Sequence, residues 1–457
     1  MKEPEKIHLK FLGGARTVTG SKTLLEVGDT KILIDCGLFQ GLKELRRKNW
    51  QKIIRDASEI DCVLLTHAHL DHCGYLPILV KNGFKGKIYC THPTRELATI
   101  VLRDSGKIQE EDANRANRYE YSSHSPAMPL YTQAHAEAVS KHFSTHNYEE
   151  WVLIEPEIKF QFLNAGHILG SAMVELKMHG RTFVFSGDIG RTNPMLLYPP
   201  KKMPQADYLI VESTYGDREH DTTDVKTELE LIIKETHRRG GILMVPTFSI
   251  ERVQEIMFLI YQLRKDGRMP EIPVYLDSPM GIRATEIFED YPKWQDLSRE
   301  DLKHMYEGIR WVNTYEASKA IVKDKKSKIV LAGSGMLQGG RILHYLNAHM
   351  GNENNTLLFT GYQAEGTRGR SILNGSSSIK FFGEYHKAKC QIASISSLSA
   401  HGDRTELIEW MKHFKAAPKK VFLNHGEPHQ LDAFRVWIQS KLGWEVVVPC
   451  PEESFEV

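Results

Sequence analysis

Thr66-His67-Ala68-His69-Leu70-Asp71-His72 is the stretch of this 457-residue chain that decides the fold. It directly follows the apolar run Cys62-Val63-Leu64-Leu65, which predicts a buried strand. Four side chains able to bind a metal ion fall within six positions. Imidazole and carboxylate together suit Zn²⁺ and its first-row neighbours, and a short loop leaving a strand can turn alternate side chains toward two adjacent ions. The stretch therefore predicts a metal centre rather than a solvated polar loop.

Composition limits what such a centre can serve. A hydrophobic content of 41% with 26% charged residues is typical of a globular protein, and the length favours two domains. No apolar run approaches the roughly 20 residues that a membrane-spanning helix needs, so we expect no membrane partner. The first six residues mix charges with proline where a signal peptide needs an apolar core. We therefore expect a cytoplasmic protein.

The net charge of +1 excludes a uniformly basic surface, so a polyanionic partner has to be bound by local patches or by metal. Residues 43–55 form one basic patch, for which a solvated helix face is the favoured interpretation. The six cysteines include no Cys-x-x-Cys pair, which argues against a disulfide framework and against a thiolate zinc site. We expect most of these cysteines to be small core residues.

The N-terminal third predicts short strands separated by glycine turns. These strands cover residues 7–12, 23–27, 31–35 and 86–90. The third one ends on Asp35, whose carboxylate can brace an active-site loop or simply cap a turn. Pro93 then opens a helix, and the polar stretch 109–150 predicts helices and loops whose histidines are mostly exposed.

Two more candidate ligands follow strand-like runs. Residues 160–163 lead into a glycine-flanked turn that holds His167, and residues 182–185 lead into Ser186-Gly187-Asp188. Each turn alone is usually structural. Together with the opening stretch, however, they give six candidate ligands, and Asp188 suits a bridging position between two cations. Two metal ions about 3.5 to 4 Å apart are the standard device for hydrolysing phosphodiesters and other activated esters or amides.

These residues resemble a known family. Asp35, the cluster from His67 to His72, His167 and Asp188 resemble, in this order, the first four motifs of the metallo-β-lactamase superfamily. The resemblance implies an α/β fold, an αββα sandwich with a dinuclear site at one edge of two packed sheets. It fixes the chemistry as hydrolysis and leaves the substrate open, because the superfamily includes lactamases, glyoxalases, lactonases and nucleases.

Beyond Glu212 the pattern changes to strands alternating with helices, which predicts a mostly parallel sheet in a separate, inserted α/β domain. The predicted strands cover residues 241–246, 274–277, 328–332 and 355–359. The glycine-rich stretch 332–340 differs from a dinucleotide fingerprint because the third glycine would have to fall at Gln338. We therefore expect no nucleotide cofactor.

The glycine-rich loops of this domain are candidate substrate contacts. Ser334 can present its hydroxyl and neighbouring backbone N–H groups to a substrate phosphate, although a simple connection between strand and helix fits the same pattern. The loop over residues 361–370 carries two arginines, of which Arg370 is the preferred phosphate ligand.

His401 and His425 each stand in a His-Gly turn after a strand-like run. With Glu212 and the stretch 246–255, they closely resemble the β-CASP branch of the superfamily, which cleaves nucleic acids. The resemblance covers essentially the whole chain. It implies a metallo-β-lactamase domain in two parts, residues 1–213 and 395–457, around an inserted Rossmann-like β-CASP domain, residues 214–394.

The resemblance also implies a set of site residues and two Zn²⁺ ions, with Mn²⁺ as an alternative. The first ion would be held by His67, His69, His167 and Asp188, and the second by Asp71, His72, His425 and the shared Asp188. A hydroxide bridging the ions would attack phosphorus. His401, paired with Glu212, would protonate the departing 3′ oxygen, which leaves 5′-phosphate and 3′-hydroxyl ends. Asp71 is counted with these two as catalytic.

His425 bears on the substrate, because family members that act on RNA resemble this sequence there, whereas DNA-repair members tend to carry an apolar residue. The inserted domain would leave a narrow channel, so we expect single-stranded RNA. A DNA nuclease remains an alternative, as does a small-molecule hydrolase, which would need no such insertion. A catalytically inactive binding subunit would be expected to have lost ligands. The choice between endonuclease and 5′-exonuclease stays open, and so does a homodimer.

Overall fold

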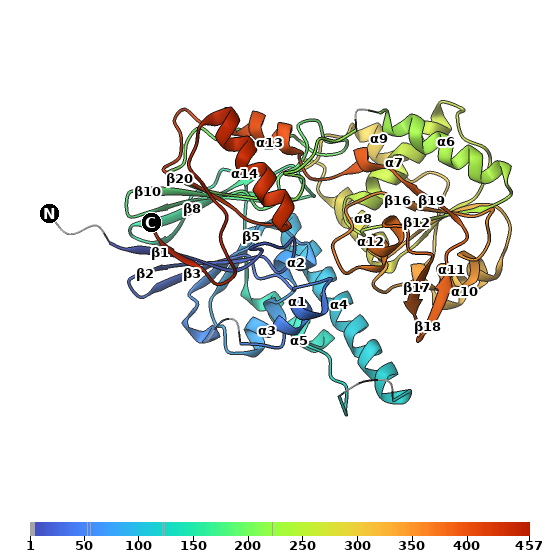
Figure 1. Ribbon diagram of the computed structural model, residues 1–457, viewed down its shortest axis with the longest axis horizontal. Coiled ribbons are helices and arrows are strands. Elements are labelled where there is room, and N and C mark those ends of the chain that lie inside the picture. Colours follow the sequence, from blue (N-terminus) through green and yellow to red (C-terminus); the bar gives the residue numbers. More distant parts are fainter. Residues whose placement is uncertain (1–4, 53, 55, 121, 123, 222) are drawn as a thin grey trace. The chain divides into compact units, whose positions relative to one another are not determined.

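The computed structural model describes residues 5–52, 54, 56–120, 122, 124–221 and 223–457. The chain divides into two compact units, which Figure 1 shows in colours that follow the sequence. Unit 1 comprises the residues up to Glu219 together with His401–Val457, and unit 2 comprises His220–Ala400. Unit 1 is therefore assembled from two segments that the whole of unit 2 separates in sequence. The domain limits expected from the sequence stay a proposal.

The first sheet of unit 1 has the strand order β22-β1-β2-β3-β4-β5-β6. Its strands are β1 (Ile7–Gly13), β2 (Lys22–Val27), β3 (Thr30–Ile34), β4 (Cys62–Leu64), β5 (Lys87–Thr91), β6 (Phe143–His146) and β22 (Ser454–Glu456). Strands β1 to β3 are antiparallel neighbours, and β3 to β6 are parallel. Gly28 turns the chain between β2 and β3 with φ +55°, a conformation that glycine adopts without strain.

The second sheet of unit 1 has the order β21-β20-β11-β10-β9-β8-β7. Its strands are β7 (Val152–Glu155), β8 (Ile158–Asn164), β9 (Ala172–Met178), β10 (Arg181–Phe185), β11 (Tyr208–Val211), β20 (Lys420–Leu423) and β21 (Val446–Val447). β11 pairs in parallel with β20, and Leu209 lies opposite Val421. This pairing brings the C-terminal segment beside the end of β11, where Glu212 follows.

The two sheets pack face to face. Their shared core takes Leu9 and Leu25 from the first sheet and Phe160 and Phe183 from the second. The helices of unit 1 are α1 (Lys43–Lys48), α2 (Leu70–Cys73), α3 (Leu76–Lys81), α4 (His92–Arg118), α5 (Gln133–Val139), α13 (Arg404–Met411) and α14 (Pro428–Leu442). α13 and α14 cover the outer face of the second sheet, while α1 to α5 lie on the side of the first (Figure 1). This arrangement confirms the predicted αββα sandwich.

Part of the prediction for residues 109–150 is wrong. The expected helices are present, since α4 continues to Arg118 and α5 follows, but β6 is a strand that extends the first sheet. Of the four histidines in this stretch only His124 is exposed. The Nδ1 atom of His135 accepts the backbone N–H of Thr132 at the start of α5, so this histidine caps a helix. The polar composition concealed these elements, because helix caps and edge strands are themselves polar.

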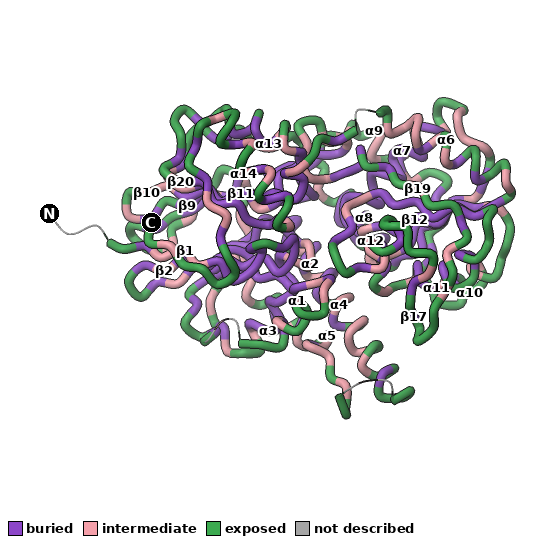
Figure 2. The backbone as a smooth tube through the Cα atoms, in the orientation of Figure 1, coloured by how far each residue is buried: buried purple, intermediate pink, exposed green. Residues whose placement is uncertain are grey.

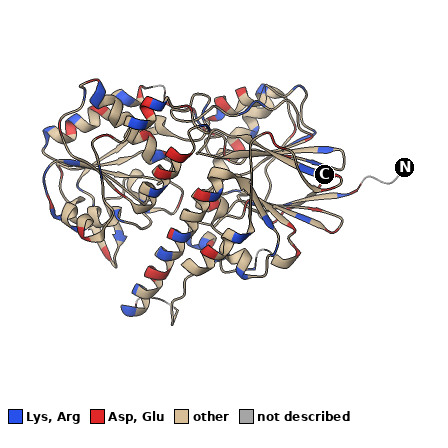
Figure 3. Ribbon diagram, turned by 180° about the vertical axis from the view of Figure 1, so that it is seen from behind, with Lys and Arg blue, Asp and Glu red and all other residues tan. Residues whose placement is uncertain are grey.

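The basic patch over residues 43–55 contains α1, which buries no residue, as expected for a solvated helix. Its last member, Arg55, lies outside the described residues. Charges of both signs also alternate along α4 (Figure 3). All six cysteines are free thiols and five are buried, which confirms the expectation of core residues. In the described part of the chain, no helix combines the length and the apolar character needed to cross a membrane.

Unit 2 is built on a six-stranded sheet of order β14-β13-β15-β12-β16-β19, in which every described pairing is parallel. Its strands are β12 (Ile242–Pro246), β13 (Val274–Asp277), β14 (Ile309–Trp311), β15 (Lys328–Ala332), β16 (Thr356–Phe359) and β19 (Gln391–Ser394), with a separate hairpin of β17 (Ser378–Phe381) and β18 (Glu384–Lys387). The strand-like run expected before His401 ends early, because β19 stops at Ser394 and a short 3-10 turn over Ser396–Leu398 follows.

Helices alternate with the strands of unit 2, as the sequence predicts. They are α6 (Val225–Arg238), α7 (Arg252–Lys265), α8 (Pro279–Asp290), α9 (Arg299–His304), α10 (Tyr315–Lys323), α11 (Ile342–His349) and α12 (Arg368–Leu373). Ile242 and Met244 pack in one core with α11, and the intervening Leu243 and Val245 are equally buried. Both faces of the sheet are therefore covered, and Figure 2 shows the buried backbone concentrated in the strands.

Candidate metal centre

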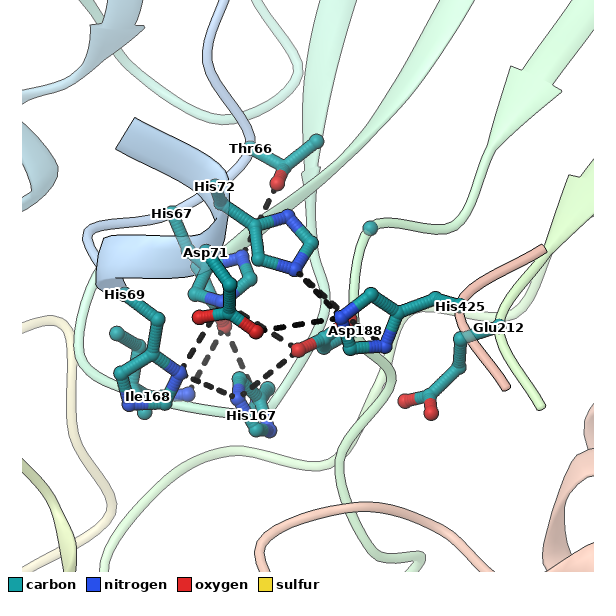
Figure 4. A network of polar contacts seen from close by, with 12 residues as sticks. Thr66, His67, His69, Asp71, His72, His167, Ile168, Asp188, Glu212 and His425 are labelled. Carbon is teal, nitrogen blue, oxygen red and sulfur yellow. Dashed lines mark hydrogen bonds and ion pairs between the residues drawn. The ribbon is translucent and has the colours of Figure 1, made fainter. Parts of the chain in front are cut away.

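The candidate ligands of unit 1 sit in loops that follow strands. These loops come after β3 (Asp35), β4 (His67 to His72), β8 (His167), β10 (Asp188), β11 (Glu212) and β20 (His425). Short apolar strands carry these loops to one place, and Figure 4 shows the imidazoles and carboxylates converging there. Residues that lie hundreds of positions apart in the chain thus become neighbours.

One group of ligands, which we call cluster A, consists of His67, His69 and His167. Nε2 of His67 lies 3.2 Å from Nδ1 of His69, and that atom lies 3.1 Å from Nε2 of His167. Oδ2 of Asp188 lies 3.4 Å from the His67 nitrogen and 3.6 Å from the His167 nitrogen. Three ring nitrogens and one carboxylate oxygen therefore face a common point.

A second group, which we call cluster B, consists of Asp71, His72 and His425. Nε2 of His425 lies 3.2 Å from Nε2 of His72 and 3.3 Å from Oδ2 of Asp71. Oδ1 of Asp188 lies 3.4 Å from the His72 nitrogen. The two oxygens of Asp188 are thus divided, with Oδ2 facing cluster A and Oδ1 facing cluster B (Figure 4).

Asp35 and Thr66 orient one imidazole in each cluster. Nδ1 of His72 donates to Oδ2 of Asp35 at 2.8 Å. The Thr66 hydroxyl donates to Asp35 and lies 3.0 Å from Nδ1 of His67, whose N–H it can accept. Both histidines are therefore held with Nε2 aimed at the site, the orientation that a metal-binding imidazole needs.

His425 is oriented by Thr214, whose hydroxyl lies 3.2 Å from Nδ1 of the ring. Its backbone has φ +50°, and Asp35 has φ +59°. Left-handed backbone is strained for residues other than glycine, and such strain concentrates at functional sites. The backbone N–H of His425 donates to the carbonyl of Gly14 at 2.9 Å, which helps to fix the loop.

The site is buried, which determines the charge of its groups. Burial, together with the neighbouring His72, holds the pKa of His67 well below its usual value, and burial lowers the pKa of His69 to about 4. Both rings are neutral at pH 7 and offer lone pairs. Burial opposes ionisation of Asp188, but the surrounding imidazoles, led by His425, hold the pKa of this carboxyl well below its usual range.

The donor set fits metal cations. Unprotonated ring nitrogens that approach one another to 3.1 and 3.2 Å repel unless a proton or a cation lies between them. Oδ1 of Asp188 is buried and accepts no hydrogen bond from the described residues. Three imidazoles with a carboxylate match zinc, and two carboxylates with two imidazoles match zinc or manganese.

Glu212 and His401 form a pair beside the clusters. Nδ1 of His401 lies 3.0 and 3.1 Å from the two carboxylate oxygens of Glu212, and Glu212 is 1% exposed. Glu212 is fixed in turn by the backbone N–H of Ile189, which donates to it at 2.7 Å. Burial disfavours a charged imidazole, yet the Glu212 carboxylate raises the pKa of His401 to about 9. His401 is therefore protonated at neutral pH.

The loop that carries His401 is attached to the loop that carries Asp188. The Glu406 carboxylate accepts hydrogen bonds from Nε of Arg191 at 2.8 Å and from the hydroxyl of Thr192 at 2.9 Å. It also accepts the backbone N–H of Asp403 at 3.0 Å. A second bond runs from the backbone N–H of Gly402 to the carbonyl of Ile189 at 2.8 Å. Glu406 is not among the residues predicted from the sequence, although its place three residues after an N-capping Asp is a recognisable capping box.

A buried lysine that was not predicted from the sequence supports the loop from Thr66 to His72. Lys22 is fully buried, its ammonium donates to the carbonyls of Gly20 and Gly37, and burial lowers the pKa of this group to about 8. Lys22 thereby joins the loops around Gly20 and Gly37. Both loops hydrogen-bond to the backbone of the metal-binding stretch, since Ser21 N–H donates to the Asp71 carbonyl at 2.8 Å and Cys36 N–H donates to the His72 carbonyl at 2.7 Å. The only sequence signal is a lysine at the start of an apolar strand.

The two predicted substrate contacts lie in unit 2. The Ser334 hydroxyl accepts the backbone N–H of Gln338 at 3.3 Å, and α11 begins several residues later, at Ile342. Arg368 donates to the carbonyls of Leu337, Gln338 and Lys380, so its guanidinium links the loop before α11 to strand β17. Both arginines lie in α12, and Arg370 stays a proposed phosphate ligand.

Comparison with known proteins finds three family matches along the chain. Residues 17–234 match the metallo-β-lactamase superfamily. Residues 253–372 match the Beta-Casp domain. Residues 385–449 match the Zn-dependent metallo-hydrolase RNA specificity domain, and this segment contains both His401 and His425.

Similar proteins match more than nine tenths of the chain. Ribonuclease TTHA0252 of Thermus thermophilus is 36% identical over 428 residues, which cover 92% of this chain and 93% of that protein. An RNase J-like protein of Methanocaldococcus jannaschii is 34% identical, and the alignment covers 96% of this chain and 97% of that protein. Transcription termination factor FttA of Methanosarcina mazei is 34% identical, and the alignment covers 92% of this chain and 67% of that protein.

Among solved structures, a protein of unknown function from Enterococcus faecalis V583 superposes with a TM-score of 0.54 at 12% identity. The superposition covers 99% of this chain and 100% of the other. At this level of identity the likeness concerns the fold alone.

Proposed function

Because this chain belongs to the β-CASP ribonucleases of the metallo-β-lactamase superfamily, we propose that it hydrolyses phosphodiester bonds of single-stranded RNA with two Zn²⁺ ions. It is a metal-dependent hydrolase. The observation that carries the proposal is the division of Asp188, which faces cluster A with one oxygen and cluster B with the other. A single bridging carboxylate between two sets of imidazoles suits a pair of cations.

The residues of the two clusters would hold the cations, and Mn²⁺ is the alternative metal. Bound cations at these positions would supply Lewis acidity, which lowers the pKa of water and offsets the charge that builds on a phosphate. The chain itself contributes fixed ligand geometry, because Asp35, Thr66 and Thr214 set the orientation of three of the imidazoles. Asp71 contributes a carboxylate to cluster B.

His401 would act as the general acid. Glu212 occupies its Nδ1 side, so the proton that the imidazolium can give away is the one on Nε2. Transfer of this proton to the departing 3′ oxygen leaves a 3′-hydroxyl on one product and a 5′-phosphate on the other. The Glu212 carboxylate keeps the acid charged at neutral pH, which is the state it needs before the reaction.

RNA is the proposed substrate because the segment that supplies His401 and His425 matches an RNA specificity domain. Ser334 and Arg370 of unit 2 are the proposed contacts to substrate phosphates, and the domain limits 213/214 and 394/395 are the proposed borders of the substrate-selecting domain. We propose the cytoplasm as its location. A homodimer and the choice between internal and 5′-terminal cleavage are open parts of this proposal.

The test is incubation of the zinc-loaded chain with 5′-monophosphorylated, 5′-triphosphorylated and circular RNA, with Asp188→Ala as the control. Cleaved circles indicate an endonuclease, and mononucleotides released only from the monophosphorylated RNA indicate a 5′-exonuclease. Single-stranded DNA of the same sequence tests the alternative of a DNA nuclease. Absence of any metal-dependent RNA product would refute the proposal.

A further inference from the structure

Unit 2 carries a row of aromatic rings on its surface, which we call the aromatic row. Tyr315 opens α10, His344 lies on α11, and Phe382 follows β17. The ring centroid of His344 lies 6.3 Å from that of Tyr315 and 5.2 Å from that of Phe382. Helices α10 and α11 and strand β17 lie side by side in Figures 1 and 2. Three separate elements thus bring their rings together at the surface.

Two rings of the row are widely exposed, since Tyr315 is 50% and Phe382 is 41% accessible. Packing alone does not explain a phenylalanine at position 382: its ring lies edge-on to the buried ring of Phe381, with the centroids 5.4 Å apart, but much of its apolar surface faces water. Exposed aromatic residues that cluster, rather than occur singly, mark interaction surfaces. The row therefore has the character of a contact surface for a partner.

Local backbone geometry does not explain Phe382 either. Phe382 and Gly383 form the two-residue turn between β17 and β18, with φ +52° and +89°. Such turns favour Asn-Gly, because asparagine tolerates left-handed backbone and a bulky side chain is strained there. The chain keeps a large apolar side chain where both exposure and backbone disfavour it. A binding role accounts for this choice.

The elements that carry the row are locally basic. Residues 315–326 contain four lysines and two acidic residues, and residues 378–389 contain three lysines and one acidic residue, whereas the whole chain has a net charge of +1. All seven lysines are exposed; they are Lys319, Lys323, Lys325, Lys326, Lys380, Lys387 and Lys389. Nζ of Lys319 lies 4.5 Å from the ring centroid of Tyr315. This charge is complementary to a polyanion.

We propose that the aromatic row and its lysines form a surface that binds single-stranded RNA. Bases would stack on the rings and phosphates would contact the lysines, the combination that single-strand binding proteins use. Single-stranded RNA presents both unpaired base faces and regularly spaced phosphates, whereas a duplex hides the base faces. The inference rests on the proposed function for its choice of RNA. It assigns to unit 2 a substrate-binding surface in addition to the proposed contacts at Ser334 and Arg370.

The central test replaces Phe382 by asparagine, the residue that this turn favours. The full chain, carrying Asp188→Ala to prevent cleavage, is titrated into fluorescein-labelled oligo(U) RNA of 30 or 6 nucleotides, and Kd is read from fluorescence anisotropy. We expect Phe382→Asn to weaken binding of the 30-mer by about tenfold, the loss of one stacked base. Binding of the 6-mer should change by less than twofold, because it gains little from a separate surface.

Folding provides the internal control. Phe382→Asn should leave the thermal midpoint unchanged or raise it, because asparagine relieves the strained turn. Leu231→Gln is the matched variant, because Leu231 is 58% exposed on α6 of the same unit and lies outside the row. It removes exposed apolar surface of comparable extent and should leave both Kd values unchanged.

The lysines are tested by salt dependence. Lys319→Gln together with Lys380→Gln should reduce the slope of log Kd against log salt by about 1.4, since each phosphate contact on a single strand contributes about 0.7. Lys293→Gln together with Lys303→Gln removes two exposed lysines elsewhere in unit 2 and should leave the slope unchanged.

Two results would overturn the inference. The first is a 30-mer affinity that changes by less than twofold in Phe382→Asn, or that falls equally in Leu231→Gln. The second is a change from dimer to monomer in Phe382→Asn by light scattering with RNA affinity intact, since the surface would then join two copies of the chain. Failure of the proposed function looks different: the chain without Asp188→Ala would cleave no RNA, while length-dependent binding lost in Phe382→Asn would still support this surface.

Discussion

Clusters A and B share Asp188 but are assembled in different ways. Cluster A draws all its imidazoles from the first segment of unit 1, between His67 and His167. Cluster B takes Asp71 and His72 from the same loop, yet it needs His425 from the segment that follows unit 2. Cluster B is therefore complete only when β20 has paired with β11. The first half of the site is local, and the second half depends on docking of the C-terminal segment.

Asp188→Ala removes the side chain that the clusters share, so it should have the largest effect. We expect RNA cleavage to fall on the order of ten-thousandfold, because cluster A loses its carboxylate and cluster B keeps only that of Asp71. Metal content by plasma mass spectrometry should drop below that of either single-cluster variant. An Asp188→Ala protein that still binds two metal ions and cleaves RNA would contradict the shared position of this residue.

Variants that remove a ligand from only one cluster should distinguish the metal ions bound at clusters A and B. His167→Ala should weaken metal binding at cluster A, and His425→Ala should do so at cluster B, each leaving one tightly bound ion and lowering cleavage on the order of a thousandfold. The measurement is metal content after dialysis against a weak chelator. His135→Ala, which alters a helix cap distant in sequence, is the control. Loss of both ions in His425→Ala would show that cluster A depends on cluster B.

His401→Ala leaves both clusters intact, so it should lower cleavage by about a hundredfold or more with metal content unchanged. The pKa of His401 is raised to about 9, and the acid is active when protonated. Cleavage should therefore decline as pH rises through about 9, and Glu212→Gln should move this decline toward the usual histidine range near 6.5. A pH profile that does not respond to Glu212→Gln would argue against the pair.

Thr66→Val should have a smaller effect, and it should lower metal affinity more at one cluster than at the other. The hydroxyl it removes contacts His67 directly, whereas His72 keeps its bond to Asp35. We expect metal affinity at cluster A to fall about tenfold and affinity at cluster B to change less. Competition with a zinc-binding dye measures both constants. Equal weakening at the two clusters would indicate general loosening of the loop.

Glu406→Gln should have the smallest effect on the reaction. It weakens the attachment of the His401 loop to the Asp188 loop without touching a ligand. We expect kcat to fall about tenfold or less, with KM and metal content unchanged. Glu409→Gln, at an exposed position of the same helix, is the matched control. A parallel loss of metal would show that Glu406 supports the clusters rather than His401.

The fold could be predicted because its signals are local. Alternation of apolar residues marked most strands of unit 1, and the switch to alternating strands and helices marked the parallel sheet of unit 2. In unit 1 the strands that were not predicted are the four edge strands β6, β7, β21 and β22 and the largely buried inner strand β9; the residues of β6 are all half-buried. Half-buried edge strands carry little apolar pattern, so their place in the sheet is set by neighbouring strands.

The candidate site was predictable in its ligand types and, apart from Asp35, not in its supports. Histidine and aspartate at strand ends are visible in any single sequence. The contacts of Lys22, Thr66 and Glu406 arise from loops that meet only in the folded chain, and each of these residues has an ordinary structural role elsewhere. Arg368 shows the converse, since a guanidinium that looked available for phosphate is engaged with three carbonyls.

The most direct measurement is a zinc titration of the metal-free chain followed by RNA cleavage at each point. The account predicts little cleavage up to one equivalent of zinc per chain, a steep rise between one and two equivalents, and no further rise beyond two. Full activity at one equivalent, or no RNA cleavage at any zinc concentration, would contradict it.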